Sequence, residues 1–241
     1  TLDWCFDLGI RCVTVYAFSI ENFNRPQEEV DDLMDLAKRK FLELADNEST
    51  LHKNKMSIRI LGDLSLLRPD VLEVLMRVVE DTKMNTDYIL NVCFPYTSQE
   101  EMATAARRIA GEVEAGDISI RSIDEQCFAD HLYTAGCGEV DVLVRTSGEI
   151  RLSDFLLWQS SFSLLSYREV LWPDFSVYEF ISVILDYQQS QAALMSIKDN
   201  YEVARARGKA QLDAEYTRLQ ARKSFSTNFV PDDTMLVERC R

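Results

Sequence analysis

Residues 140–159 read Val-Asp-Val-Leu-Val-Arg-Thr-Ser-Gly-Glu-Ile-Arg-Leu-Ser-Asp-Phe-Leu-Leu-Trp-Gln. The first five of these residues form a short, β-branched apolar run that is typical of a buried strand. Gly148 allows a sharp turn soon after the run. Arg145 and Arg151 therefore follow the carboxyl end of a strand, which is where open α/β sheets bind their ligands. The stretch predicts a parallel sheet with a polar loop at one edge.

The two arginines of this loop are candidates for a diphosphate site. A guanidinium group is planar, permanently charged and able to bind phosphate through two hydrogen bonds. The hydroxyl of Ser153 adds a further polar group beside Arg145 and Arg151. Alternatively, the loop is a surface turn in which the arginines pair with Glu149 and Asp154, because structural ion pairs use such turns as well. The spacing alone leaves both interpretations open.

Outward from this stretch, apolar residues recur alternately at strand and helix spacing. Strands are expected at residues 10–18, 57–61, 88–94, 140–144 and 161–166, and helices at residues 2–8, 26–44, 69–82, 98–113, 123–131 and 176–206. We expect a capping box from Ser98 to Glu101 to begin the helix at residues 98–113. This alternation predicts an α/β fold, with a mostly parallel central sheet covered by helices on both faces. One domain is expected at residues 1–208, followed by a polar tail at residues 209–241 that is helical or disordered.

A second polar loop follows the strand predicted at residues 10–18. It contains Ser19, Asn22 and Arg25, and it lies at the same edge of the predicted sheet as Arg145. Two plainer interpretations stay open, since Arg25 could cap the following helix and Ser19 and Asn22 could form turn hydrogen bonds. Asp63, after the strand at residues 57–61, is interpreted as a helix cap rather than a catalyst.

Composition excludes several classes of function. The chain has 241 residues and a formal net charge of -14, which disfavours general binding to nucleic acid. Six cysteines without a C-x-x-C pair, and two histidines without metal-ligand spacing, favour reduced thiols over a disulfide framework or a zinc site. No apolar run approaches the length of a membrane span, and no nucleotide-binding glycine motif is present.

Four segments carry a resemblance to a known family. They are residues 15–25 (Val-Tyr-Ala-Phe-Ser-Ile-Glu-Asn-Phe-Asn-Arg), 90–94 (Leu-Asn-Val-Cys-Phe), 145–159 and 171–173 (Leu-Trp-Pro). Together they resemble the cis-prenyltransferase (undecaprenyl diphosphate synthase-like) family, and most of all its eukaryotic dehydrodolichyl diphosphate synthase branch. The resemblance covers roughly residues 2–191.

This resemblance implies a chain-elongating prenyl transferase. Such an enzyme adds isopentenyl diphosphate units to an allylic diphosphate such as farnesyl diphosphate, with Mg²⁺, and forms each new double bond in cis. The product would feed dolichol synthesis and protein glycosylation. The growing hydrocarbon would occupy a hydrophobic tunnel, and inward-facing residues that could line it are Leu33, Met34, Leu90, Val92 and Phe94.

The resemblance also implies roles for individual residues. Arg145, Arg151 and Ser153 would bind isopentenyl diphosphate, and Arg25 would contact the allylic diphosphate. Ser19 and Asn22 would form the catalytic polar pair beside the reacting carbons. Phe18 and Phe23 would line the entrance to the tunnel.

Three departures from the family pattern shape the expected assembly. The family's phosphate-binding loop, whose aspartate holds magnesium, would lie upstream of Thr1, so we expect an amino-terminal strand and loop to be missing, the chain alone to be inactive, and no metal ligand among its residues. Ile150 and Leu164 stand where bacterial relatives have a histidine and a glutamate, and the relatives' carboxyl-terminal Arg-x-Gly is absent.

The last two departures favour a subunit that uses its partner's tail. The implied partner is a membrane-anchored homologue similar to the Nogo-B receptor, which would contact residues 155–171. The implied location is the cytosolic face of the endoplasmic reticulum membrane, with membrane contact through the partner and the product. A noncatalytic scaffold subunit of the same complex is the main alternative, and a phosphate-ester hydrolase is a weaker one because Ser19 has no neighbouring histidine.

Overall fold

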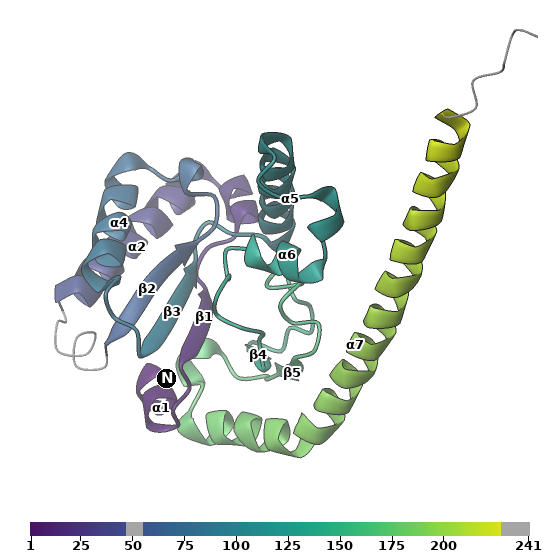
Figure 1. Cartoon of the computed structure of the whole chain (residues 1–241). Coiled ribbons are helices and arrows are strands. Elements are labelled where there is room, and N and C mark those ends of the chain that lie inside the picture. The colour runs from purple at the N-terminus through teal and green to yellow at the C-terminus, as the bar shows by residue number, and fades with distance from the viewer. Residues whose placement is uncertain (47–54, 228–241) are drawn as a thin grey trace, which may run out of the picture. The chain divides into compact units, whose positions relative to one another are not determined.

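The computed structural model describes residues 1–46 and 55–227, in which strands and helices alternate along the chain (Figure 1). The strands are β1 (Cys12–Tyr16), β2 (Met56–Leu61), β3 (Tyr88–Cys93), β4 (Val142–Arg145) and β5 (Leu164–Tyr167). The α-helices are α1 (Leu2–Asp7), α2 (Gln27–Asp46), α4 (Pro69–Thr82), α5 (Ser98–Ala115), α6 (Glu125–Asp130) and α7 (Val177–Thr227). Short 3₁₀ turns are η1 (Ile20–Asn24), η2 (Leu64–Leu66), η3 (Ile120–Ser122) and η4 (Trp172–Asp174). All five expected strands and all six expected helices are present.

The strands form two parallel sheets. One has the order β1-β3-β2, and the other pairs β4 with β5. The sequence correctly predicted parallel strands, but it predicted one central sheet. Within the described residues β1 and β4 each have a single strand neighbour, so the two sheets stay separate. The carboxyl ends of β1 and β4 carry the two polar loops, as expected.

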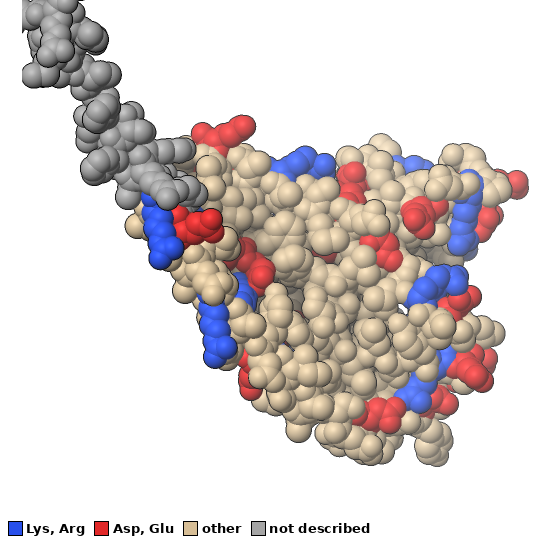
Figure 2. All heavy atoms as spheres, turned by 90° about the vertical axis from the view of Figure 1, so that its right-hand side faces the viewer, with Lys and Arg blue, Asp and Glu red and all other residues tan. Residues whose placement is uncertain are grey.

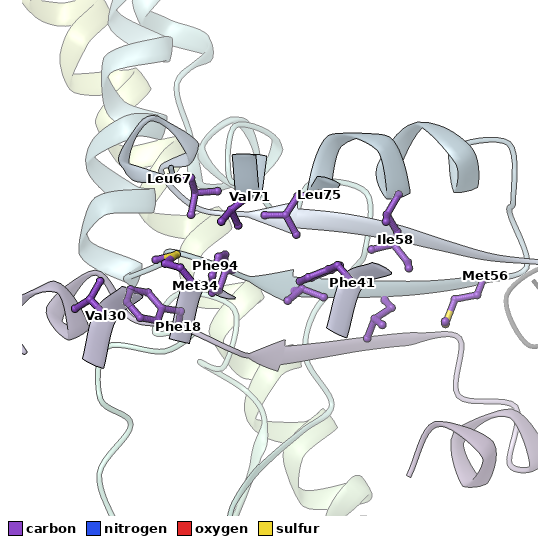
Figure 3. Close-up of a cluster of buried hydrophobic side chains, with 13 residues drawn as sticks. Phe18, Val30, Met34, Phe41, Met56, Ile58, Leu67, Val71, Leu75 and Phe94 are labelled. Atoms are coloured by element: carbon purple, nitrogen blue, oxygen red, sulfur yellow. The ribbon is translucent and has the colours of Figure 1, made fainter. Parts of the chain in front are cut away.

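The largest core lies between the three-stranded sheet and the helices α2 and α4 (Figure 3). Side chains alternate along a strand, so Ile58, Leu90 and Val92 face these helices. They pack against residues such as Met34 of α2 and Leu75 of α4, and burying each such side chain stabilises the fold by roughly 1.5–3 kcal/mol. Four of the five residues expected to line a tunnel, namely Met34, Leu90, Val92 and Phe94, are at most 5% exposed, and Leu33 packs against them. They form a packed core here, and the tunnel stays a prediction.

The opposite face of this sheet points toward α5 and α6 (Figure 1). A smaller apolar cluster there joins Leu61 of β2, Cys93 of β3 and Tyr96 to Leu156 in the loop after β4. The sheet is therefore covered on both faces, as the alternation predicted.

Helix ends confirm some local predictions and correct one. α4 begins at Pro69 and ends at Thr82, as expected from proline at a first-turn position. Asp63 accepts a hydrogen bond from the Ser65 amide and caps η2, which confirms its interpretation as a cap. The predicted capping box from Ser98 to Glu101 is wrong, because the N-cap of α5 is Thr97, whose hydroxyl accepts from the Glu100 amide.

The chain divides into two units, residues 1–187 and 188–241. α7 extends to Thr227, well beyond the end expected near Ala206. Loss of an apolar stripe did not end the helix, because the residues that follow include good helix formers such as alanine, glutamine, lysine and arginine. The expected tail is thus helical through Thr227, and its remainder, residues 228–241, lies outside the described residues. No helix in the described ranges is both long enough and apolar enough to cross a bilayer.

Candidate functional site

Arg145, the last residue of β4, is held across its own loop. Its Nη1 donates to the carbonyl oxygen of Arg151 at 2.5 Å and to the hydroxyl of Ser153 at 2.8 Å. The structure therefore brings together all three residues predicted to bind isopentenyl diphosphate. Amide hydrogen bonds from Ser147 to the Val170 carbonyl and from Gly148 to the Arg168 carbonyl tie the loop to the chain after β5.

The side chain of Arg151 points to a different partner. Its Nη1 contacts the carboxylate of Glu149, and 65% of the arginine side chain is exposed. One of the two ion pairs of the surface-turn interpretation is thus present. Asp154 instead accepts from the Gln99 amide at 3.2 Å. Neither arginine lacks a protein partner, but Arg151 stays accessible to an anion from solvent.

The loop after β1 forms a compact turn. Asn22 accepts at Oδ1 from the Ser19 amide at 2.8 Å, while the Ser19 hydroxyl accepts from the Glu21 amide at 3.2 Å. The turn hydrogen bonds that the sequence left open are therefore present. Arg25 pairs with Glu29 at 2.5 Å, and both side chains are 47% exposed. This exposure lets Arg25 exchange its carboxylate partner for another anion at little cost.

The two phenylalanines of this loop differ in burial. Phe18 is 3% exposed and belongs to the main core, where its ring lies 5.3 Å from that of Phe94. Phe23 is half-buried and meets Phe18 edge-on at 5.1 Å. The ring of Phe23 is therefore partly exposed at the loop, whereas the ring of Phe18 packs beneath it in the core.

Tyr16, which sequence reasoning missed, connects the two loops. It ends β1, and its hydroxyl donates to the Tyr96 carbonyl at 3.0 Å and lies 3.4 Å from the Ser153 carbonyl. Its ring stacks on Phe155 at 4.7 Å. Burial raises the pKa of Tyr16, and a hydrogen bond with the Ser19 side chain opposes that rise. Tyr16 thus contacts residues of both loops.

The segment after β3 lies between the same two loops. The Ile20 amide donates to the Tyr96 carbonyl at 3.3 Å, and the Ser98 amide donates to the Asp154 carbonyl at 2.8 Å. Asp154 therefore sits at the first turn of α5, where backbone amides favour a carboxylate. Burial raises the pKa of Asp154, and the negative charge of Glu21 from the other loop adds to the rise.

A buried carboxylate beneath the site was also missed. Glu101 of α5 is 1% exposed and accepts from the Tyr96 hydroxyl at 2.5 Å, the Tyr133 amide at 2.8 Å and the Gln159 amide group at 3.0 Å. Ser98 accepts from the Leu157 amide at 2.8 Å. The sequence did not indicate these roles of Ser98 and Glu101, because serine and glutamate at this spacing also fit a helix N-terminus.

The charges of the site are local rather than spread over the protein. On the face shown in Figure 2, lysines and arginines are interspersed with aspartates and glutamates, without a broad basic area. In the part of the chain that the structure describes, no group of three His, Cys, Asp or Glu side chains is arranged to hold a metal ion. The site therefore offers a few placed cations and hydroxyls for an anionic ligand.

Comparison with known proteins identifies relatives. The sequence profile of a family described as "Putative undecaprenyl diphosphate synthase" matches residues 1–194. The human dehydrodolichyl diphosphate synthase complex subunit DHDDS is 46% identical over 213 residues, which cover 88% of this chain and 64% of that protein. A geranylgeranyl-diphosphate-specific tritrans,polycis-undecaprenyl-diphosphate synthase of Methanocaldococcus jannaschii is 42% identical, over 79% of this chain and 68% of that protein.

Solved structures agree on the fold. Lavandulyl diphosphate synthase from Lavandula x intermedia, crystallised with dimethylallyl diphosphate, superposes with a TM-score of 0.72 at 30% identity, covering 77% of this chain and 79% of that one. A "probable undecaprenyl diphosphate synthase" from Campylobacter jejuni gives a TM-score of 0.68 at 29% identity, over 78% and 84% of the two chains. The chain spans just under two thirds of the length of its human and mouse relatives.

Proposed function

Because the chain belongs to the undecaprenyl diphosphate synthase family of cis-prenyltransferases, we propose that it is a catalytic subunit that elongates farnesyl diphosphate with isopentenyl diphosphate. Its product would be a dehydrodolichyl-type polyprenyl diphosphate. The observation that carries this proposal is the loop after β4, where Arg145 and Ser153 are in contact at 2.8 Å and Arg151 lies exposed beside them. A noncatalytic scaffold would have no use for this arrangement.

The reaction needs positioned charge rather than a covalent intermediate. The carbon–oxygen bond of the allylic diphosphate breaks, the alkene of isopentenyl diphosphate attacks that carbon, and a proton leaves the adjacent methylene. Arg145, Arg151 and Ser153 would hold the diphosphate of isopentenyl diphosphate, and Arg25 would contact the allylic diphosphate after releasing Glu29. Such contacts act by orienting the reactants and by stabilising the charge that develops on the leaving group.

Ser19 and Asn22 would lie beside the reacting carbons. The Ser19 amide donates to Oδ1 of Asn22 and the Asn22 backbone amide donates to the Ser19 carbonyl, which fixes the turn and leaves the side-chain nitrogen Nδ2 of Asn22 without a partner among the contacts of that turn. This nitrogen would then donate to the diphosphate oxygens, and the Ser19 hydroxyl would orient these oxygens or accept a hydrogen bond from the methylene side of the reaction. The growing hydrocarbon would pass Phe23 and enter between α2 and the sheet, which requires side chains such as Leu33 and Met34 to separate.

We propose Mg²⁺ as the cofactor, although the described residues do not form a magnesium site by themselves. Magnesium prefers oxygen ligands and is often bound by one or two carboxylates together with substrate phosphates. Asp154 is committed to the first turn of α5, so it does not fit this role. When bound, magnesium would neutralise diphosphate charge. Chelation with EDTA should therefore abolish turnover, and added Mg²⁺ should restore it.

The proposed partner is a membrane-anchored homologue similar to the Nogo-B receptor, at the cytosolic face of the endoplasmic reticulum. Support comes from apolar side chains left exposed on and beyond residues 155–171, among them Leu165 at 40%, Leu171 at 58% and Trp172 at 54%. Clustered exposed apolar residues mark protein or membrane contact sites. Charged substitutions at Leu171 and Trp172 should reduce co-purification of such a partner.

The decisive experiment measures incorporation of radiolabelled isopentenyl diphosphate by the full-length protein, co-expressed with the partner. Losing one charged contact costs roughly 1.5–3 kcal/mol, so Arg145→Ala and Arg151→Ala should each raise the KM for isopentenyl diphosphate by about 10- to 100-fold. Arg77→Ala on α4 is a matched control, because Arg77 is 74% exposed and its only described partner is Asp81. Unchanged kinetics in both loop variants would refute the site, and an inactive wild-type complex would favour the scaffold alternative.

A further inference from the structure

Two cysteine sulfurs and two hydrogen-bond donors meet on the α5–α6 side of the three-stranded sheet. Asn91 of β3 is fully buried, and its Nδ2 lies 3.4 Å from the sulfur of Cys137 and 3.6 Å from that of Cys12. Arg59 of β2 donates from Nη1 to the Cys137 sulfur at 3.3 Å. The same Nη1 lies 3.1 Å from the Ala135 carbonyl, which fixes the guanidinium in place.

The two sulfurs of this cluster differ in their hydrogen-bond donors. The Cys137 sulfur accepts hydrogen bonds from the Asn91 side-chain amide and from the Arg59 guanidinium, whereas the Cys12 sulfur accepts from the Asn91 amide alone. The hydrogen bond from Cys12, together with Asn91 and Arg59, lowers the pKa of Cys137 to about 6. The neighbouring sulfur and burial raise the pKa of Cys12. In the part of the chain that the structure describes, Arg59 is the one charged group that contacts either sulfur.

A reactive cysteine is recognised by such a setting. It is partly exposed and lies beside a cation, while a cysteine buried among apolar groups is inert. Cys137 and Cys12 are partly exposed, in contrast to the buried Cys5 and Cys93. Burial raises the pKa of Cys93, as expected for an inert thiol. The prenyl transfer proposed above uses neither Cys137 nor Cys12, which lie away from the loops that hold its residues.

We infer that Cys137 and Cys12 form an oxidisable thiol pair, in which Cys137 is the nucleophile toward peroxides and Cys12 is the resolving thiol. The Cys137 thiolate attacks one oxygen of hydrogen peroxide, the O–O bond breaks and hydroxide leaves, giving a sulfenic acid. Cys12 then attacks the Cys137 sulfur and loses its proton to the departing hydroxyl, so that a disulfide and water form. Hydrogen peroxide is the oxidant, and both cysteines are oxidised.

This bond would join β1 to the segment that leads into β4. β1 ends at Tyr16, next to the turn of Ser19, and β4 ends at Arg145, so the bond would tether the strands that carry both halves of the site. Oxidation would change how far these strands can move apart. The test below does not depend on prenyl transfer, so the thiol pair and the proposed function can fail separately.

The first arm of the test measures thiol reactivity in the full-length protein, with Cys240→Ser in every variant. At pH 6 about half of Cys137 is thiolate, against about 0.3% of an ordinary cysteine with a pKa of about 8.5, although its lower basicity costs part of that advantage. Iodoacetamide should therefore alkylate Cys137 about tenfold faster than Cys127, a partly exposed cysteine on α6. Arg59→Gln should remove part of the difference. Equal rates for Cys137 and Cys127 at pH 6 in the wild-type protein would overturn the inference, even if the Arg59 variant does not fold.

The second arm follows oxidation by hydrogen peroxide. Cleavage before aspartate separates Cys127 from Cys137, because Asp130 lies between them. Mass spectrometry of the unreduced digest should show the Cys12 and Cys137 peptides linked, and Cys12→Ser should instead leave a sulfenic acid on Cys137 that dimedone traps. Over-oxidation of Cys137 without any link to Cys12, or a link between other cysteines, would overturn the pairing.

Discussion

Gly62 is the residue at which the fold has least tolerance for a side chain. It follows β2 with φ +143, a conformation that non-glycine residues rarely adopt. A Cβ at this position would lie 1.8 Å from the Pro95 carbonyl oxygen, so the backbone after β3 would have to move. The sequence predicted only that a strand ends here, because close approach of a distant backbone segment leaves no local pattern.

We therefore expect Gly62→Ala to lower the free energy of unfolding by about 3 kcal/mol, from backbone strain and overpacking. Gly111→Ala is the matched control. A Cβ at Gly111 would meet nothing within 4 Å, and Gly111 lies inside α5, so alanine should raise stability by about 0.5–1 kcal/mol. Urea denaturation of both variants gives the comparison. Equal effects of the two substitutions would show that contact of a Cβ at position 62 with the Pro95 carbonyl does not destabilise the fold.

His131 makes stability depend on pH at the junction of α5 and α6. Its Nδ1 lies 2.6 Å from the Cys127 carbonyl and its Nε2 lies 3.0 Å from the Glu112 carboxylate, so both ring nitrogens are placed to donate. The hydrogen bond to the Cys127 carbonyl, supported by Glu112, raises the pKa of His131. A raised folded-state pKa adds stability that is fully present below the unfolded value of about 6.5 and is lost as pH rises through the folded value.

The expected result is a pH-dependent effect of His131→Gln. The variant should be less stable than wild type at pH 5.5, and the difference should shrink toward pH 8.5, as the wild-type imidazole loses its proton. Paired denaturation curves at the two pH values measure this, with Glu112→Gln expected to remove part of the same dependence. A difference that is constant across the range would show that packing, not protonation, sets the contribution of His131.

Among the elements, α5 joins the fold to the candidate site through Glu101. Three donors from three different segments end on this buried carboxylate, and glutamine could satisfy only some of them because its amide nitrogen would face a donor. Glu101→Gln should therefore lower the free energy of unfolding by about 2–3 kcal/mol, whereas Glu114→Gln, on the exposed face of the same helix, should change it by less than about 0.5 kcal/mol. Thermal and urea unfolding would measure both. Similar free energies of unfolding for the two variants would show that the hydrogen bonds to Glu101 do not stabilise the fold.

The order of strands and helices could be predicted from the sequence. The N-cap of α5 could not, because two positions fit the same local pattern. Thr97 with Glu100 and Ser98 with Glu101 both fit the helix-start spacing of a hydroxyl and a glutamate. The structure uses Thr97 as the cap, because the Ser98 hydroxyl is bonded to the Leu157 amide and Glu101 to Tyr96. Those partners are distant in sequence, so local spacing could not rank the two possibilities.

The candidate site was predictable to the same extent. Because strand ends in one parallel sheet share an edge, the sequence predicted that the loops of Ser19 and Arg145 lie together, whereas the structure has β1 and β4 in separate sheets and connects their loops through Tyr16. Tyr16, which contacts both loops, looked like an ordinary aromatic residue of a strand, and nothing in its spacing distinguishes it from the residues of the core. Local patterns therefore predicted which loops would form the candidate site, and long-range contacts decide how those loops are held.

At the scale of the whole molecule, the start of α7 belongs to the part of the chain that we expect to unfold as one unit. Phe180 and Val183 of α7 are buried with Cys5 and Phe175, so the start of this helix belongs to the core of residues 1–187. From residue 188 onward no side chain that the structure describes is buried. Stability should then depend on the first turns of α7 and not on its later turns that the structure describes.

Ending the chain at Gly208 should accordingly change the Tm by less than about 2 °C, since none of the side chains that the structure describes beyond Gly208 is buried. Val183→Ala, on the same helix, removes buried surface worth about 2 kcal/mol and should lower the Tm by roughly 4–8 °C. Differential scanning calorimetry of the two variants separates a loss of core packing from a loss of helix length. A truncation that lowers the Tm as much as Val183→Ala would place residues 209–241 in the cooperative unit, because chain segments stabilise a domain only through surface that they bury against it.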